Sequence, residues 1–173
     1  MRVLSLFDGM SCGQIALQDL GVNIEKYYAS EVDKFAIAQT QLNFPDTMQL
    51  GDVERWGEWD IDWSSIDLLI GGSPCQGFSF AGKQLAFDDP RSRLFFVYVD
   101  ILNHLRKCNP RIKFLLENVV MKKEHINVIT ECLGIHPVMI NSALVSAQSR
   151  KKALLEQHTN KDRGVVRRCL YRY

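Results

Sequence analysis

The chain has 173 residues, of which 46% are hydrophobic and 24% charged, enough to bury one sizeable core and too few for two. Its formal net charge of +1 gives no general basic field, so composition alone does not identify a nucleic-acid-binding protein. Five scattered cysteines without a CxxC pair argue against disulfides and a structural metal. The opening Met1–Leu6 resembles neither a signal peptide nor a membrane span, so we expect an intracellular protein without membrane contact.

Segments typical of strands and helices alternate along the chain. Strands are predicted at Arg2–Phe7, Ile24–Ser30, Ile66–Ile70, Ile112–Leu116 and Val138–Asn141, and helices at Gln14–Leu20, Phe35–Asn43, Ser92–Cys108 and near Glu124–Leu133. Asp33 is expected to cap the second helix and Pro45 to end it. This alternation implies right-handed crossovers and an α/β fold, a doubly wound and mostly parallel sheet.

Polar residues stand where four of these strands end. In a doubly wound sheet, ligands bind beyond the carboxyl ends of the strands, at the point where strand order reverses. The four signals are Phe7-Asp8-Gly9, Glu31, Ser73-Pro74-Cys75-Gln76 and Glu117-Asn118-Val119.

The first two signals indicate a nucleoside cofactor. A glycine turn lets backbone approach a ligand, and an acid about twenty residues later can bind both ribose hydroxyls. Glu31 has that spacing from Gly9, although it could instead cap the following helix. The residues 8–13 are not a GxGxxG pyrophosphate loop, which favours S-adenosylmethionine over NAD.

Cys75 is the candidate nucleophile. It follows Pro74 in a glycine- and serine-rich loop that suits a reactive thiolate, whereas the other four cysteines fit small buried hydrophobic positions. His104, His125 and His136 lie in or beside elements away from the predicted site, which disfavours a Cys and His hydrolase.

Glu117 is the candidate acid, because it follows an apolar pair at a strand end. Its alternative is a helix-capping carboxylate. A cysteine nucleophile with an acid and no base points to attack on an electron-poor ring, a demand that cytosine meets.

Seven motifs in order resemble the DNA (cytosine-5) methyltransferase family, over residues 1–152. They are Leu6-Phe7-Asp8-Gly9, Ser30-Glu31-Val32-Asp33, Gly51-Asp52-Val53, the nucleophile loop 72–79, Arg93-Leu94-Phe95-Phe96, Glu117-Asn118-Val119 and the basic motif 148–152. The resemblance implies an S-adenosylmethionine-dependent, Rossmann-like methyltransferase fold, incomplete at its C-terminus.

The family's activity is methyl transfer from S-adenosylmethionine to carbon 5 of a flipped cytosine in DNA, through a covalent adduct with Cys75. The resemblance assigns catalysis to Cys75, Glu117, Arg150 and Lys152. It assigns cofactor binding to Phe7, Asp8, Gly9, Glu31, Val32, Asp52, Val53, Pro74 and Leu94. No metal is implied.

The sequence departs from the family in two places. Lys152 stands where the family has an arginine, which keeps the charge but loses the planar fork. From Ala153 the family's aromatic strand, target-recognition region and final helix are absent, so 1–152 is expected to be the catalytic domain and 153–173 a basic tail, disordered or out of frame. A one-base shift can turn Ala153–Gln157 into Arg-Tyr-Trp-Ser-Asn, which motivates the hypothesis of a frameshift just before Ala153.

Three alternatives stay open at this point. A sister group of the family methylates transfer RNA with nearly the same residues, although Ser73 and the residues after Cys75 look more like the DNA enzymes. The chain could also be an inactive remnant that binds cofactor or DNA weakly, or it could act with a complementing chain that supplies the missing region. A restriction partner, a viral origin and an epigenetic role all fit the motifs.

Overall fold

The computed structural model describes residues 1–74, 90–119, 123–141, 143 and 151–156. The elements in chain order are β1 (Arg2–Leu6), α1 (Cys12–Asp19), β2 (Lys26–Ser30), α2 (Lys34–Asn43), β3 (Met48–Gln49), the 3₁₀ helices η1 (Val53–Glu58) and η2 (Trp63–Ser65), β4 (Leu68–Gly71), α4 (Pro90–Cys108), β5 (Lys113–Val119), α5 (Lys123–Leu133), β6 (Val138–Asn141) and β7 (Lys151–Glu156). Among the described residues, no helix combines the length and apolar character that crossing a membrane requires.

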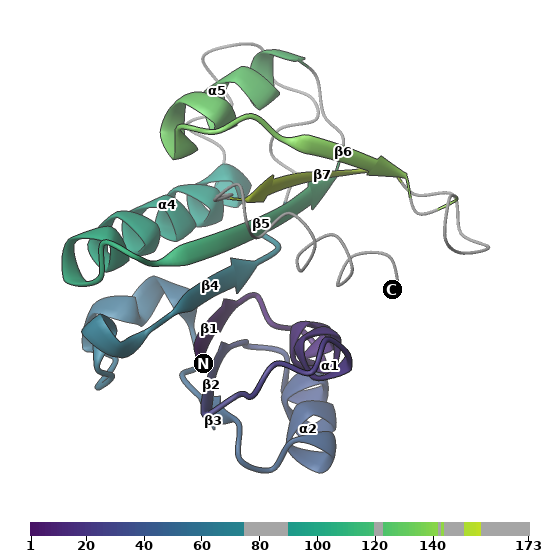
Figure 1. Cartoon of the computed structure of the whole chain (residues 1–173), viewed down its shortest axis with the longest axis vertical. Coiled ribbons are helices and arrows are strands. Elements are labelled where there is room, and N and C mark those ends of the chain that lie inside the picture. The colour runs from purple at the N-terminus through teal and green to yellow at the C-terminus, as the bar shows by residue number, and fades with distance from the viewer. Residues whose placement is uncertain (75–89, 120–122, 142, 144–150, 157–173) are drawn as a thin grey trace.

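These strands form one seven-stranded sheet in the order β3-β2-β1-β4-β5-β7-β6 (Figure 1). The first five in this order are parallel, and β7 runs antiparallel to both of its neighbours. The chain moves outward from β1 in one direction through β2 and β3, then returns to the other side of β1 with β4. This reversal makes the gap between the carboxyl ends of β1 and β4 the expected ligand site.

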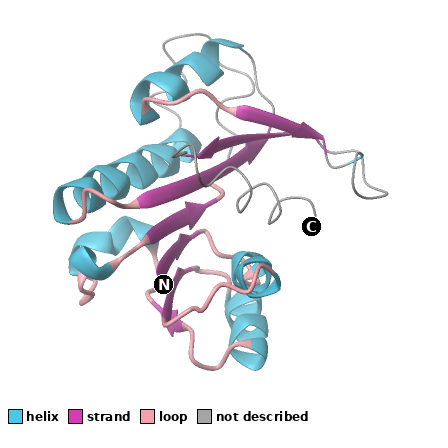
Figure 2. Cartoon of the chain, viewed as in Figure 1, coloured by secondary structure: helices cyan, strands magenta, loops and turns pink. Residues whose placement is uncertain are grey.

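Side chains alternate along each strand, so every strand sends residues to both faces of the sheet. Each face is buried in a core of its own. Leu4 and Leu6 of β1 belong to the larger core, which includes Phe95 and Tyr98 of α4, whereas Val3 packs in a smaller core with α1. Figure 2 shows α4 and α5 on one side of the strands and α1 with α2 on the other. The predicted doubly wound, mostly parallel sheet is therefore confirmed.

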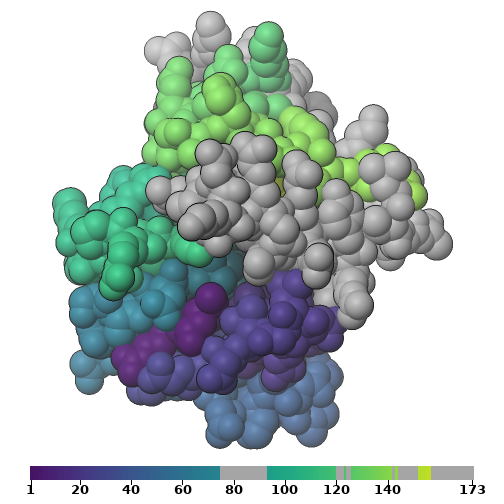
Figure 3. Space-filling model, in the orientation of Figure 1, coloured from purple at the N-terminus to yellow at the C-terminus, as the bar shows by residue number. Residues whose placement is uncertain are grey.

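Most predicted elements are present, with ends that move by a few residues. Asp33 caps α2 as expected, accepting hydrogen bonds from Phe35 N at 2.8 Å and Ala36 N at 3.0 Å. The sequence did not predict β3, η1 or η2, which are short. In the space-filling view, the N-terminal part of the chain gathers at one end of the molecule and α5 with β6 at the other (Figure 3).

The predicted end of the catalytic domain needs correction. We expected the fold to stop at Lys152, yet β7 continues to Glu156 and pairs with both β5 and β6. Ala153, Leu154 and Leu155 are all buried, because an apolar run of this kind fills a central strand readily. The remainder of the predicted tail, 157–173, lies outside the described residues.

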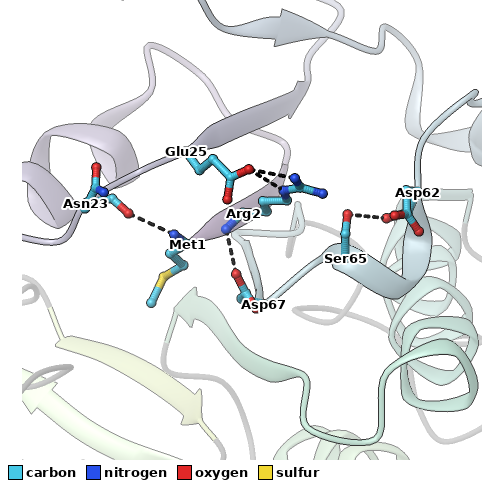
Figure 4. Close-up of polar contacts among 7 residues, drawn as sticks. All are labelled: Met1, Arg2, Asn23, Glu25, Asp62, Ser65 and Asp67. Carbon is cyan, nitrogen blue, oxygen red and sulfur yellow. Dashed lines mark hydrogen bonds and ion pairs between the residues drawn. The ribbon is translucent and has the colours of Figure 1, made fainter.

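At the amino ends of the strands, polar contacts fix the start of β1 (Figure 4). The Met1 amino group donates to Asn23 O at 2.9 Å, and Arg2 N donates to Asp67 Oδ2 at 2.7 Å. The Arg2 guanidinium pairs with Glu25 at 2.6 Å. These contacts join β1 to the residues just before β2 and β4.

Candidate active site

The loop after β1 has an unusual backbone. Phe7, Gly9 and Ser11 have positive φ angles of 56°, 60° and 60°. Glycine adopts this region freely, whereas the other two residues incur a steric cost there. A Cβ added at Gly9 would have no atom within 4 Å, so the outer side of the turn is open. The loop therefore combines a fixed backbone with free space at the carboxyl end of β1.

Glu31, at the end of β2, holds this loop. Its Oε2 accepts a hydrogen bond from Gly9 N at 2.8 Å, and its Oε1 accepts from Val32 N at 2.8 Å and Asp33 N at 2.9 Å. Gly9 and Glu31, which the sequence assigned to one nucleoside cofactor, are thus in direct contact. The Val32 side chain beside them is 70% exposed.

Asp52 lies beyond β3 on the same edge of the sheet. Its carboxylate caps η1 by accepting from Glu54 N at 2.9 Å, and it is exposed. The preceding Gly51 has a φ of 75°, and its carbonyl accepts from Ser30 Oγ at 2.8 Å, which connects this turn to the end of β2. Val53 belongs to the larger core, so only its backbone faces this edge.

The segment after β4 leads toward the predicted nucleophile. A Cβ at Gly72 would lie 3.1 Å from Glu117 Oε2, so the lack of a side chain lets the acid approach. Ser73 is buried and accepts a hydrogen bond from Asn118 Nδ2 at 3.4 Å, whereas Pro74 is exposed. Cys75 itself lies outside the described residues.

Glu117 and Lys152 form an ion pair between β5 and β7. Both side chains are half-buried, at 38% and 32% exposure, which screens the pair less than a fully exposed one. Their strands run antiparallel, with Lys152 opposite Val119 in the register. Two of the predicted catalytic residues are therefore in direct contact, and the predicted partner Arg150 lies outside the described residues.

Leu94 lies near the start of α4 and packs against the larger core while remaining partly exposed. Its neighbour Arg93 forms an ion pair with Glu54 of η1 at 3.0 Å. This pair connects the start of α4 to the turn that carries Asp52.

The Asp8 carboxylate points beneath the loop. Tyr27 donates to its Oδ1 at 2.8 Å, and Ser11 donates to its Oδ2. Burial raises the pKa of Asp8, while hydrogen bonds from Ser11, Ser5 and Tyr27 lower it. Sequence reasoning did not single out Tyr27, because a tyrosine in a strand is normally an ordinary core residue and nothing local marks its hydroxyl.

The described residues contain no cluster of three or more His, Cys, Asp or Glu side chains arranged to hold a metal ion. The polar groups described on this edge include carboxylates, backbone amides and the Lys152 ammonium group. Such a set suits an organic ligand with hydroxyl and amino groups.

Comparison with known proteins identifies the family. Residues 1–134 match the family model described as C-5 cytosine-specific DNA methylase. The match covers the strands that carry Gly9, Glu31, Asp52 and Glu117.

Curated relatives come from phages and bacteria. The chain is 42% identical over 127 residues to the orphan methyltransferase M.Rho11sI of Bacillus phage rho11s, covering 69% of this chain and 23% of that protein. It is 39% identical over 141 residues to the orphan methyltransferase M.SPRI of Bacillus phage SPR, covering 78% and 31% respectively. The type II methyltransferase M1.ScrFI of Lactococcus lactis subsp. cremoris is 40% identical over 124 residues, covering 72% and 30%. The matched parts therefore span less than a third of these relatives.

A solved structure supports the fold. A crystal structure of a triple mutant of DNMT2 from Spodoptera frugiperda aligns with a TM-score of 0.61 and 22% identity, over 92% of this chain and 50% of that one. From the family match over residues 1–134, the chain belongs to the C-5 cytosine-specific DNA methylase family.

Proposed function

We propose that these residues are the cofactor-binding and catalytic part of a DNA (cytosine-5) methyltransferase. The contact of the Glu117 carboxylate with Lys152 and its approach to Gly72 support this most directly. Gly72 precedes Cys75 by three residues, so the acid stands beside the start of the nucleophile loop. Attack on a cytosine ring needs this combination of a thiolate and a group that holds the ring.

The residues at the ends of β1 and β2 fit S-adenosylmethionine. The Glu31 carboxylate can accept from ribose hydroxyls, the exposed Val32 offers an apolar surface to the adenine ring, and the side of Gly9 is open. The Asp52 carboxylate can accept from the adenine amino group, and Phe7, Pro74 and Leu94 are the further contacts that the family resemblance implies. When bound, this cofactor supplies an electrophilic methyl group.

In the proposed reaction, Cys75 adds to carbon 6 of a cytosine flipped out of the duplex. Glu117 holds the ring nitrogen and the exocyclic amine, so that carbon 5 becomes nucleophilic and accepts the methyl group. Lys152 and Arg150 provide positive charge beside the acid and the nucleotide. A water molecule then takes the proton on carbon 5, and the electron pair of that C–H bond re-forms the C5–C6 double bond as the C6–S bond breaks and the Cys75 thiolate departs.

Methyl transfer is proposed for a longer polypeptide that contains these residues. The curated relatives extend well beyond the matched parts, and sequence-specific binding of DNA needs contacts to base edges in the groove. These contacts would come either from a continuous chain or from a complementing one. Whether this longer polypeptide works alone or together with a restriction enzyme is a further part of the same proposal.

The test is transfer of a tritiated methyl group from S-adenosylmethionine to duplex DNA and, in parallel, to folded RNA. The chain is assayed with and without a recognition region taken from a relative. Cys75→Ala should abolish incorporation into DNA, and Cys108→Ala, which alters a half-buried cysteine of α4, should not. Incorporation into RNA alone would reassign the substrate, and no incorporation under any condition despite cofactor binding would indicate an inactive remnant.

A further inference from the structure

A buried series of hydrogen bonds runs beneath the loop between β1 and α1. The Tyr27 hydroxyl donates to Asp8 Oδ1 at 2.8 Å, and the Ser11 hydroxyl donates to Asp8 Oδ2. The Thr40 hydroxyl of α2 lies 3.3 Å from both Ser11 Oγ and Gly9 O. Tyr27 is 2% exposed, and Ser11 and Thr40 are fully buried. Residues from β2, the loop after β1 and α2 therefore meet under one turn.

This turn needs support from outside itself. Phe7 and Ser11 hold positive φ angles, which persist only where the surrounding structure determines them. Ser11 occupies the N-cap position of α1, yet its side chain makes no capping hydrogen bond and bonds Asp8 instead. The Gly9 carbonyl is reached by Thr40 and its N–H by Glu31, so both ends of that residue are fixed.

We propose that Tyr27 is a positioning residue whose hydroxyl fixes the Asp8 carboxylate and thereby presets the loop that carries Gly9 for the cofactor. Asp8 then holds the loop from beneath by accepting the hydrogen bond of Ser11. Glu31 holds the Gly9 amide from the side on which the cofactor would bind. The part of this proposal that concerns the cofactor rests on the proposed function. The part that concerns the loop does not.

The packing around Tyr27 leaves its hydroxyl little freedom. A Cβ at Gly13 would lie 3.2 Å from that hydroxyl and 2.5 Å from Ile70 Cδ1, so the first turn of α1 lies directly over the ring end. Among the described residues, the titratable groups that act on the Asp8 carboxyl are Tyr27 from β2 and Glu31 from the end of β2, and Cys12 at the start of α1 acts on Tyr27.

The test compares Tyr27→Phe with Tyr28→Phe in the full chain. Both variants remove one hydroxyl from β2, but Tyr28 belongs to the larger core on the other face of the sheet. The first readout is hydrogen exchange at the Gly9 amide in the free protein. The second is the dissociation constant for S-adenosylhomocysteine, by calorimetry. Tyr27→Phe should speed exchange about tenfold and weaken binding about five- to tenfold, as loss of one hydrogen bond predicts. Tyr28→Phe should leave both within twofold.

The pH dependence of S-adenosylhomocysteine binding distinguishes a positioning role of Tyr27 from a general loss of stability. Asp8 accepts hydrogen bonds from Tyr27 and Ser11 at the same time, an arrangement that its charged form provides although burial favours the protonated form. The Tyr27 hydrogen bond lowers the pKa of that group. In Tyr27→Phe, the loss of affinity at falling pH should therefore begin at a higher pH than in the wild type. A variant that is only destabilised would keep the wild-type midpoint.

Gly9 exchange in Tyr27→Phe that matches Tyr28→Phe would overturn the proposal. Faster exchange with unchanged affinity would overturn its role toward the cofactor. If the wild type binds no S-adenosylhomocysteine at all, the proposed function fails, and the exchange measurement still decides whether Tyr27 holds the loop.

Discussion

The two edges of the sheet use polar residues in opposite ways. At the amino ends, Arg2 pairs with Glu25 and also donates to Asp67, in contacts that water reaches. At the carboxyl ends, Asp8 and Glu31 accept hydrogen bonds and Glu117 forms an ion pair, all in buried or half-buried positions. Exposed pairs contribute little to stability, whereas buried polar groups need defined partners. Contacts at the amino edge therefore fix strand register, and contacts at the carboxyl edge fix the geometry of a site.

The difference also concerns backbone strain. The positive φ angles at Phe7 and Ser11 lie at the carboxyl edge, and nothing comparable among the described non-glycine residues occurs at the amino edge. Strained residues cluster where function needs a preset geometry. Among the described residues, strained backbone and buried polar contacts therefore gather at the carboxyl edge, and each prediction below tests that asymmetry.

The largest effect is expected from Gly72→Ala. The new methyl group would lie 3.1 Å from Glu117 Oε2 and push the acid away from the nucleophile loop. Methyl transfer should fall about 100-fold, as loss of a group that stabilises the transition state predicts. Gly57→Ala is the matched control, because a Cβ there meets nothing within 4 Å. Equal activity of the two variants in a methyl-transfer assay would contradict the placement of Glu117.

The second largest effect is expected on cofactor binding, where one substitution at each edge can be compared directly. Glu31→Gln points an amide donor at backbone N–H groups and should weaken S-adenosylhomocysteine binding about tenfold or more, since hydrogen bonds to charged groups contribute about 1.5–3 kcal/mol. Glu25→Gln, which loses its pair with Arg2 at the amino edge, should bind normally. Calorimetry of both variants makes the comparison, and similar losses in the two would show that the edges do not differ.

A smaller change is expected at Lys152. Lys152→Arg introduces a planar guanidinium that can hold Glu117 and a base oxygen together. It should raise the rate of methyl transfer about two- to fivefold, because the gain in free energy is smaller than that of one full hydrogen bond to a charged group. Lys152→Met keeps the length without the charge and should reduce transfer. An increase with methionine would show that the ion pair hinders the reaction.

The smallest effect concerns stability against pH. Burial raises the pKa of Asp8, so the folded state binds its proton more readily than the unfolded state. Relative to Asp8→Asn, the wild type should therefore gain stability as the pH falls through the raised pKa and lose that advantage toward neutral pH. Melting temperatures of both proteins across this range provide the measurement, and the opposite slope would mean that the carboxylate is favoured in the fold.

The sequence predicted the strands and long helices well, because continuous apolar runs mark buried strands and helical spacing marks α4. It also assigned Gly9 and Glu31 to one cofactor, and because the two residues follow adjacent parallel strands, the fold brings them into contact. The two-residue β3 carries too little pattern to detect. The strand β7 was misjudged because Ala153–Leu155 differ from the family's motif while still suiting a central strand.

The buried hydrogen bonds were beyond sequence reasoning for a different reason. Tyr27 and Asp8 are 19 positions apart, and Thr40 and Ser11 are 29 apart, so no local spacing links them. Asp8 was expected to contact the cofactor because it lies in the cofactor motif. Only the fold shows that its carboxylate is directed beneath the loop.

The most direct test of the account is covalent trapping. The chain, joined to or mixed with a recognition region from a relative, is incubated with S-adenosylmethionine and duplex DNA that contains 5-fluorocytosine, whose fluorine blocks the final elimination. We expect a denaturant-resistant adduct that peptide mapping assigns to Cys75 and that Glu117→Gln strongly reduces. An adduct at another cysteine, or one that persists after Cys75→Ala, would contradict the assignment of the carboxyl edge as the methyltransferase site.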